Sequence, residues 1–276
     1  MNEALNHIKE QQVALAFTNQ SAVFDQLYAT NGIVAYKRGR VRQFLLKYLR
    51  PGSRILELNA GTGDDAVFLA KLGHHVHATD ISTGMQARLK EKVLFHELDT
   101  LVTQELCSFS SLENLKDKGP FDCIFSNFAG LNCTGDLYKV LASFNDLLKP
   151  GGTVVLVILP KFCLWETLLV LKGKFKTAGR RFFSSGGRKA KIDDAYFNCW
   201  YHSPRFIRRS LKDGFEFKEL EGLCTIVPPS YIENFPEKYP RLYGWLCKME
   251  SKLKGKWPWK YIGDYYIISL QKAHSV

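Results

Sequence analysis

Several features that would assign this chain to other protein classes are missing from its 276 residues. The seven cysteines include no CxxC pair and are odd in number, which predicts reduced thiols rather than a disulfide framework. No spacing of histidines, cysteines or carboxylates is typical of a catalytic metal site. The longest apolar run, Val154 to Leu159, is too short to cross a bilayer, and the segment MNEALNHIKEQQ lacks the apolar core of a signal peptide. We therefore expect a cytoplasmic protein without a bound metal.

What the chain does have is apolar material for one large core and an excess of positive charge. Apolar residues make up 46% of the sequence, and the formal net charge is +11. An α/β domain with a cap commonly reaches this length without dividing. One enzyme-sized domain is therefore expected.

The stretch from Ile55 to Asp80 has the pattern of a nucleoside-binding βαβ unit. An apolar strand is followed by Gly61 and Gly63, which allow a tight turn and a close approach to a ligand. A helical repeat and a second strand follow. Asp80 ends that strand 17 residues beyond Gly63, near where such folds place a carboxylate against ribose hydroxyls. The unit predicts an adenosine-type ligand.

Glu57 decides which ligand this is. The segment GTGDDA also fits the G-x-G-x-x-A form of a dinucleotide fingerprint, so an NAD(P)-dependent oxidoreductase is an alternative. An acid at the mouth of the first strand would repel a pyrophosphate, but it suits the cationic amino and sulfonium groups of S-adenosylmethionine. Here the chain resembles the class I S-adenosylmethionine-dependent methyltransferases, whose first motif is an acid followed by x-Gly-x-Gly-x-Gly. Asn59 stands at the first glycine of that motif, where it would add a side-chain amide near the ligand carboxylate.

Three later segments fit the same family. In VTQELCSFSSLENL, residues 107–109 fall where the family binds the adenine amino group. Ser108 stands in place of the aspartate that is usual there. Asp99 is the alternative position for that aspartate. FDCIFSNFAGLNC predicts a buried strand that opens at Ser126 and Asn127 onto the cofactor cleft. LLKPGGTVVLVIL predicts a helix end, a turn and a buried strand over 153–159.

The resemblance implies a cofactor site built from the residues that follow the strand ends, with a tyrosine of the N-terminal segment closing over it. An apolar shelf against adenine would come from Ile81 and Phe109, with Met85 nearby. The implied cofactor-binding residues are Tyr36, Glu57, Asn59, Ala60, Gly61, Gly63, Asp80, Ile81, Met85, Cys107, Ser108, Phe109, Asn127 and Phe128.

The expected fold is α/β and Rossmann-like, with a mostly parallel seven-stranded sheet, an antiparallel edge strand and helices on both faces. Residues 1–50 form a helical segment that contributes to a cap, and residues 51–276 form the methyltransferase domain. Two inserts, 160–201 and 228–263, follow strands and should lie over the cleft, because loops at the carboxyl ends of strands surround the ligand.

Both inserts are basic and aromatic, which leaves three interpretations of the acceptor side. A solvated basic face is one. A nucleic-acid groove is the second, but no Asn-Pro-Pro-Tyr sequence follows the fourth strand and no cysteine motif for carbon-5 methylation is present. The third, which we favour, is a small or lipid-like acceptor approached from an anionic membrane surface. A cofactor-binding protein without turnover is a further alternative.

Methyl transfer from a sulfonium is an in-line displacement, so the protein must chiefly position and desolvate the reactants. A hydroxyl oxygen is the expected methylated atom, with carbon and nitrogen as the alternatives, and a base can remove the hydroxyl proton. His202, in FNCWYHSP, is the first candidate, with simple packing at that junction as the alternative. Glu166, the lone acid of a basic apolar stretch, is the second candidate.

Overall fold

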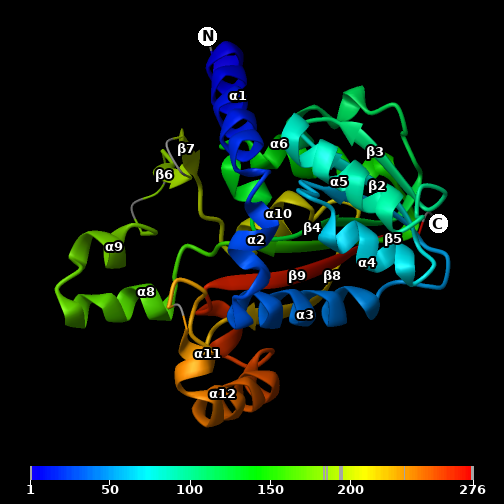
Figure 1. The fold of residues 1–276 in the computed structure, drawn as a ribbon. Coiled ribbons are helices and arrows are strands. Elements are labelled where there is room, and N and C mark those ends of the chain that lie inside the picture. The colour runs from blue at the N-terminus through cyan, green and yellow to red at the C-terminus, as the bar shows by residue number, and fades with distance from the viewer. Residues whose placement is uncertain (1, 183, 185, 193–194, 233, 275–276) are drawn as a thin grey trace.

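A computed structural model describes residues 2–182, 184, 186–192, 195–232 and 234–274 (Figure 1). Within these residues a seven-stranded sheet has the order β3-β2-β1-β4-β5-β9-β8. A separate two-stranded hairpin is formed by β6 and β7. The strands are β1 (Arg54–Leu58), β2 (His75–Asp80), β3 (Val102–Leu106), β4 (Phe121–Ser126), β5 (Leu148–Ile158), β6 (Arg188–Ile192), β7 (Ala195–Cys199), β8 (Phe215–Leu223) and β9 (Tyr265–Lys272).

The sheet is parallel except for one strand. Strands β1 to β5 pair in parallel, whereas β9 runs antiparallel to both of its neighbours, β5 and β8. The Rossmann-like fold with an antiparallel pair at one edge is therefore confirmed. The reversed strand itself, β9, lies one place in from the edge, and β8 forms the edge.

Helices cover both faces of the sheet, and each face has its own apolar core. On one face α3 (Gly32–Leu46), α4 (Asp64–Lys71) and α5 (Thr83–Phe95) pack over Ile55 and Phe125. On the other, η1 (Phe109–Asn114), α6 (Leu137–Ala142), α7 (Phe144–Leu147) and α10 (Pro204–Ser210) pack over Leu56 and Ile124. Burial on both faces explains why these strands are apolar almost throughout.

The N-terminal helices stand over the carboxyl ends of the strands. Helix α1 (Asn2–Gln20) rises beside the β6–β7 hairpin, and α2 (Phe24–Ala29) leads back to α3 (Figure 1). The rings of Phe17 and Phe197 lie 6.0 Å apart across the α1–hairpin contact. Three hydrogen bonds join α1 and α2 to the segments that follow β1, β2 and β3: Thr62 to Asp25, Thr18 with Ser82, and Ser108 to Glu10.

The two inserts differ in structure. The first contains α8 (Leu164–Leu168), η3 (Leu169–Lys172), α9 (Phe175–Gly179) and the β6–β7 hairpin, so it is not purely helical. The second contains α11 (Phe235–Lys238), α12 (Pro240–Leu253) and η4 (Trp259–Tyr261). Both inserts and α1 lie on the side of the sheet where the parallel strands end (Figure 1).

Helix α12 is held to the sheet by one buried carboxylate. The two oxygens of Glu250 accept hydrogen bonds of 2.8–3.0 Å from the consecutive backbone N–H groups of residues 224–227. Arg40 of α3 lies 4.0 Å from the same carboxylate. A carboxylate that fills such a ring of donors fixes the second insert against the end of β8.

Some element boundaries differ from the sequence-based expectation. The predicted helix end is divided at Ser143 into α6 and α7, and β5 begins at Leu148, so the KPGG turn lies inside the bounds of the strand. Ser203 caps α10, since its side chain accepts from the Phe206 N–H at 3.2 Å. Among the helices described, none combines the length and the apolar character needed to cross a bilayer.

Candidate active site

The turn after β1 requires its glycines. Gly61 and Gly63 have positive φ angles of 57° and 81°, a conformation that side chains disfavour. A Cβ on Gly63 would also lie 2.7 Å from Cγ of Leu89. The Gly61 N–H donates to the Asp80 carboxylate at 2.9 Å. The turn is therefore closed against the end of β2, as the βαβ pattern predicted.

Asn59 does not present its amide to the cleft in the way expected from the sequence. Its φ angle is 48°, and its Nδ2 donates to the Asn127 carbonyl at 2.9 Å. Its Oδ1 accepts from the Ser126 hydroxyl at 2.6 Å. The side chain thus ties the β1 turn to the end of β4.

Glu57, at the end of β1, has a buried carboxylate oxygen that accepts no hydrogen bond from the described residues. The side chain is 2% exposed, and its Oε2 has no hydrogen-bond partner among the described residues. Burial raises the pKa of this carboxyl well above its usual range, and nearby Asp65 raises it further. A buried carboxylate oxygen without a donor fits a ligand that brings a cationic amino group.

Asn127 and Asp65 interact with each other close to Glu57. The Asn127 Nδ2 donates to Oδ2 of Asp65 at 2.7 Å, and Arg42 of α3 donates to the other oxygen at 2.7 Å. The roles of Asp65 and Arg42 were missed from the sequence. The acidic pair after Gly63 was the only local sign, because Arg42 lies 23 residues earlier in the chain.

The carboxylate of Asp80 is oriented by the backbone. Its oxygens accept from the N–H groups of Gly61 and Ser82, both at 2.9 Å. Burial raises the pKa of Asp80, and these hydrogen bonds lower it. Ile81 is half-buried beside it, whereas Met85 is 1% exposed inside the fold.

The segment after β3 lies next to Asp80, as expected for the adenine side. The Cys107 N–H donates to the Asp80 carbonyl at 3.1 Å. Ser108 caps η1 and donates to Glu10 of α1 at 3.2 Å, so its hydroxyl already has a protein partner. Phe109 is half-buried against the core. Asp99, the competing position, is exposed before β3 begins, at the opposite end of that strand.

Tyr36 faces the second insert and not the glycine turn. Its hydroxyl accepts from Arg40 at 3.0 Å, and its ring makes an edge contact with Tyr243 of α12 at 6.4 Å. Burial raises the pKa of this phenol well above its usual range. The prediction that Tyr36 closes over the cofactor is not supported by this position.

The neighbouring Lys37 is a functional candidate that the sequence did not reveal. It is 2% exposed, and its Nζ donates to the Ser230 hydroxyl at 3.0 Å. The same ammonium lies 5.6 Å from the ring centre of Phe128 and 4.8 Å from that of Tyr265. Among the described residues, no carboxylate forms an ion pair with it.

Glu166 is not placed to act as a base, contrary to the sequence-based hypothesis. Its carboxylate is 1% exposed and accepts from Arg180 at 2.8 and 2.5 Å and from Arg181 at 2.6 Å. These guanidinium groups lower the pKa of Glu166 despite its burial. A carboxylate held by two arginines stays ionised and gains little by taking a proton.

A cluster of Cys163, Glu166 and Asp264 has ligand atoms within 4.8 Å of one another. The Arg181 guanidinium lies between the two carboxylates, 2.6 Å from Glu166 and 2.7 Å from Asp264. Together with Arg180, which also binds Glu166, it balances the charge of these two acids, so the geometry describes an ion-pair network.

His202 lies where the first insert returns to the sheet. Its N–H donates to the Leu159 carbonyl at 3.1 Å, and its ring stacks on Phe206 at 4.9 Å. Its Nε2 is buried and has no partner in the described part of the chain. Burial, aided by Lys161, lowers the pKa of His202 to about 4.

The comparisons with known proteins agree with this geometry. Residues 55–152 match a family model described as a methyltransferase domain. Over these residues the chain is similar to a methyltransferase domain, and its sheet has the fold of the class I methyltransferases. Its cofactor is S-adenosylmethionine, and the buried, partnerless oxygen of Glu57 beside the glycine turn fits that ligand. The nicotinamide-dependent alternative is not supported.

Individual methyltransferases resemble this chain over different lengths. A demethylmenaquinone methyltransferase from Staphylococcus haemolyticus is 31% identical over 156 residues, which is 54% of this chain and 62% of that protein. The match thus covers less than two thirds of the relative.

Solved methyltransferase structures show the same fold at lower identity. A 1,6-didemethyltoxoflavin-N1-methyltransferase from Burkholderia thailandensis has a TM-score of 0.58 at 15% identity, over 97% of this chain and 90% of that one. A SAM-dependent methyltransferase from Methanosarcina mazei has a TM-score of 0.58 at 17% identity, over 84% and 98%.

Proposed function

We propose that this protein transfers the methyl group of S-adenosylmethionine to a small, lipid-like acceptor with a hydroxyl on an aromatic ring, as in a hydroquinone. The hydroxyl oxygen is the proposed methylated atom. The proposal includes a cytoplasmic location and peripheral contact with a membrane. The relatives named for demethylmenaquinone support an acceptor of the quinone class.

The observation that carries this proposal is the position of Lys37. Phe128 follows the carboxyl end of β4, and Tyr265 begins β9 beside the end of β5, so both rings lie where the parallel strands end. A buried ammonium over two rings is stabilised by an acceptor oxygen that carries negative charge. Lys37 would therefore favour the phenolate of an acceptor and lower its pKa.

The protein's part in the reaction is positioning and desolvation. When bound, S-adenosylmethionine supplies an electrophilic methyl group. Glu57 would bind its amino group, and Asp80 its ribose hydroxyls. The acceptor hydroxyl would lose its proton to a base, and its oxygen would take the methyl group, with S-adenosylhomocysteine as the leaving product. Lys37 would stabilise the oxyanion that exists after proton loss and before methyl transfer.

His202 remains a proposed proton acceptor for this step. With a pKa of about 4 it is neutral at neutral pH, so its Nε2 is free to accept. A base this weak serves only an acceptor whose own pKa is lowered. The positive charge of Lys37 would lower the pKa of the acceptor hydroxyl in this way.

Methylation at a ring carbon is the second candidate. A phenolate delocalises its charge onto the neighbouring carbons, so the same lysine would activate either atom. The relatives named demethylmenaquinone methyltransferase support methylation at a ring carbon as this second candidate.

The test is a product analysis with purified protein. Isotopically labelled S-adenosylmethionine is incubated with hydroquinones, simple phenols and a single-stranded oligonucleotide, and the products are resolved by mass spectrometry. Methylated hydroquinone is expected, with its fragmentation locating the methyl group on oxygen. Lys37→Met should lower turnover at least tenfold, while the exposed control Lys71→Met leaves it unchanged. Methylation of the oligonucleotide alone, or no effect of Lys37→Met, would refute the proposal.

A further inference from the structure

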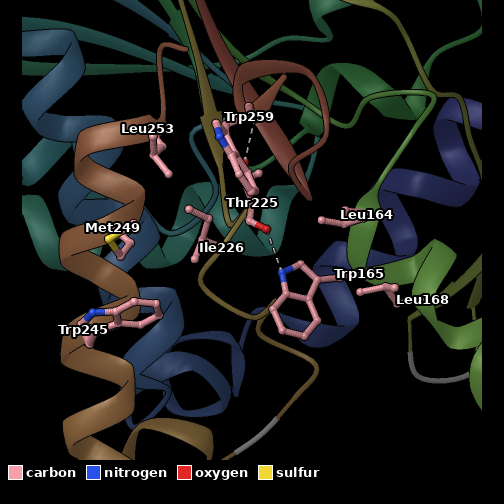
Figure 2. Close-up of a pocket in the computed structure, with 9 residues that line it drawn as sticks. All are labelled: Leu164, Trp165, Leu168, Thr225, Ile226, Trp245, Met249, Leu253 and Trp259. Atoms are coloured by element: carbon pink, nitrogen blue, oxygen red, sulfur yellow. Dashed lines mark hydrogen bonds between the residues drawn. The ribbon is translucent and has the colours of Figure 1, made fainter. Parts of the chain in front are cut away.

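An apolar groove separates the two inserts on the outside of the cap. It encloses about 300 Å³ between α8 and α12 (Figure 2). The Trp165 indole donates to the Thr225 carbonyl at 3.1 Å, and the Thr225 hydroxyl donates to the Trp259 carbonyl at 3.1 Å. These polar groups of the groove lining are therefore hydrogen-bonded to one another. The lining residues are Leu164, Trp165, Leu168, Thr225, Ile226, Trp245, Met249, Leu253 and Trp259.

The rims of this groove expose large apolar side chains. Leu168 of α8 is 45% exposed, and Leu171, one turn further along in η3, is 83% exposed. Across the groove, Leu242 and Trp245 of α12 are 47% and 57% exposed. Contiguous exposure of this kind marks an interaction surface, since scattered single residues would be the norm.

Positive charge runs along the same helix. Arg241, Lys248 and Lys252 are exposed and recur at helical spacing beside the stripe formed by Leu242 and Trp245. The whole insert 228–263 has seven lysines and arginines against three glutamates, and one of those, Glu250, is buried. An apolar stripe bordered by cations matches a surface with an apolar interior and anionic headgroups.

We propose that the α8–α12 face, defined by Leu168, Leu171, Leu242, Trp245, Arg241, Lys248 and Lys252, docks on the surface of an anionic lipid bilayer. Trp245 and the leucines would enter the boundary between headgroups and acyl chains, and the cations would lie among the phosphates. A nucleic acid is disfavoured because the groove pairs its indole rings with aliphatic side chains rather than with cations inside it.

This inference deepens the proposed lipid-like acceptor but is tested separately from it. A vesicle assay measures binding, not turnover. Failure of docking would leave methyl transfer to a soluble hydroquinone intact, and failure of methyl transfer would leave vesicle binding intact.

The experiment is co-sedimentation of the full chain with two kinds of vesicle, phosphatidylcholine alone and phosphatidylcholine mixed with phosphatidylglycerol. Preferential binding to the mixed vesicles, weakened by salt, is expected. The double variant Lys248→Glu, Lys252→Glu should bind at least about 30-fold less, because removing each lysine weakens binding roughly fivefold and reversing its charge weakens it further. Trp245→Ser should weaken binding to a similar degree.

Matched controls lie on α4 and α5, which pack on β2 and β3 near the edge of the sheet opposite to β8. Lys71→Glu on α4 changes an exposed charge, and Phe95→Ser on α5 removes a ring that is 82% exposed. Both should bind vesicles like the unaltered protein, and all variants should bind S-adenosylhomocysteine equally. Equal binding to both vesicles, variants that match the controls, binding of an oligonucleotide in place of vesicles, or a dimer that Trp245→Ser converts to monomer would each overturn the proposal.

Discussion

The side chain of Asn59 fills the space that a Cβ on Gly130 would need. Such a Cβ would lie 2.2 Å from Cγ of Asn59, whose amide is fixed by Asn127 and Ser126. The two positions are therefore a matched pair. A side chain in place of the usual first glycine of the motif is accommodated by a glycine 71 residues later.

This pairing predicts strong coupling between the two sites. Gly130→Ala should destabilise the protein by about 1–3 kcal/mol, because the added methyl overpacks a fixed amide. In the Asn59→Gly background the same change should cost much less. Urea unfolding of the four proteins in the cycle measures the coupling energy. Effects that add within about 0.5 kcal/mol would show that the two side chains do not compete for this space.

Glu57 should make cofactor affinity depend on pH. Its raised pKa means that acidification protonates it, whereas a cationic ligand needs the ionised form, so affinity for S-adenosylhomocysteine should fall as pH is lowered through that pKa. Glu57→Gln should bind about 10- to 100-fold more weakly at pH 7.5 and lose this pH dependence. Calorimetric titration between pH 5 and 7.5 tests this. Glu216→Gln, an exposed carboxylate on β8, serves as the control, and a Glu57→Gln profile parallel to the unaltered one would contradict the assignment.

His202 should make stability fall in mild acid. Its folded pKa of about 4 lies below the ordinary value near 6.5, so the unfolded state binds more protons between these values. The stability present above pH 6.5 is therefore lost progressively toward pH 4, by up to about 3 kcal/mol. His202→Phe keeps the ring contact with Phe206 but cannot ionise, so its Tm should change less between pH 7 and 4.5. The exposed control His75→Phe should follow the unaltered protein; if His202→Phe does too, the histidine does not titrate as described.

Glu250 should contribute strongly to the free energy of unfolding, because four backbone N–H groups donate to its carboxylate. Glu250→Gln replaces one acceptor oxygen with an NH₂ group that would face backbone N–H donors of 224–227, and it removes the charge near Arg40. We expect a loss of about 3–5 kcal/mol in the free energy of unfolding. Denaturant titration measures it, with the exposed Glu237→Gln as the control. A loss below about 1 kcal/mol would mean that the ring of donors does not depend on the carboxylate.

The parts of the site that could be predicted from sequence are those made by adjacent residues. Gly61, Gly63 and Asp80 follow from one βαβ pattern, because turn geometry and strand ends are local properties. Lys37 could not be found this way: in AYKRGRVR it resembles an ordinary charged helix face, and its burial depends on Ser230, 193 residues away.

The interpretation of Glu166 failed for a related reason. A lone acid in a basic stretch resembles a base without partners, because the sequence does not show which residues bind it in the fold. Arg180 and Arg181 fold back over 14 and 15 residues to bind it, and proximity in the fold, not composition, determines whether a carboxylate can take up a proton.

The pairing of Leu223 with Tyr265 fixes both ends of the second insert at one place in the sheet. The segment that carries α12 begins after Leu223 of β8 and ends before Tyr265 of β9, so its two ends leave the sheet side by side. The ring of Tyr265 lies beneath the Lys37 ammonium. The second insert and the proposed acceptor site therefore share one anchoring residue in the sheet, Tyr265.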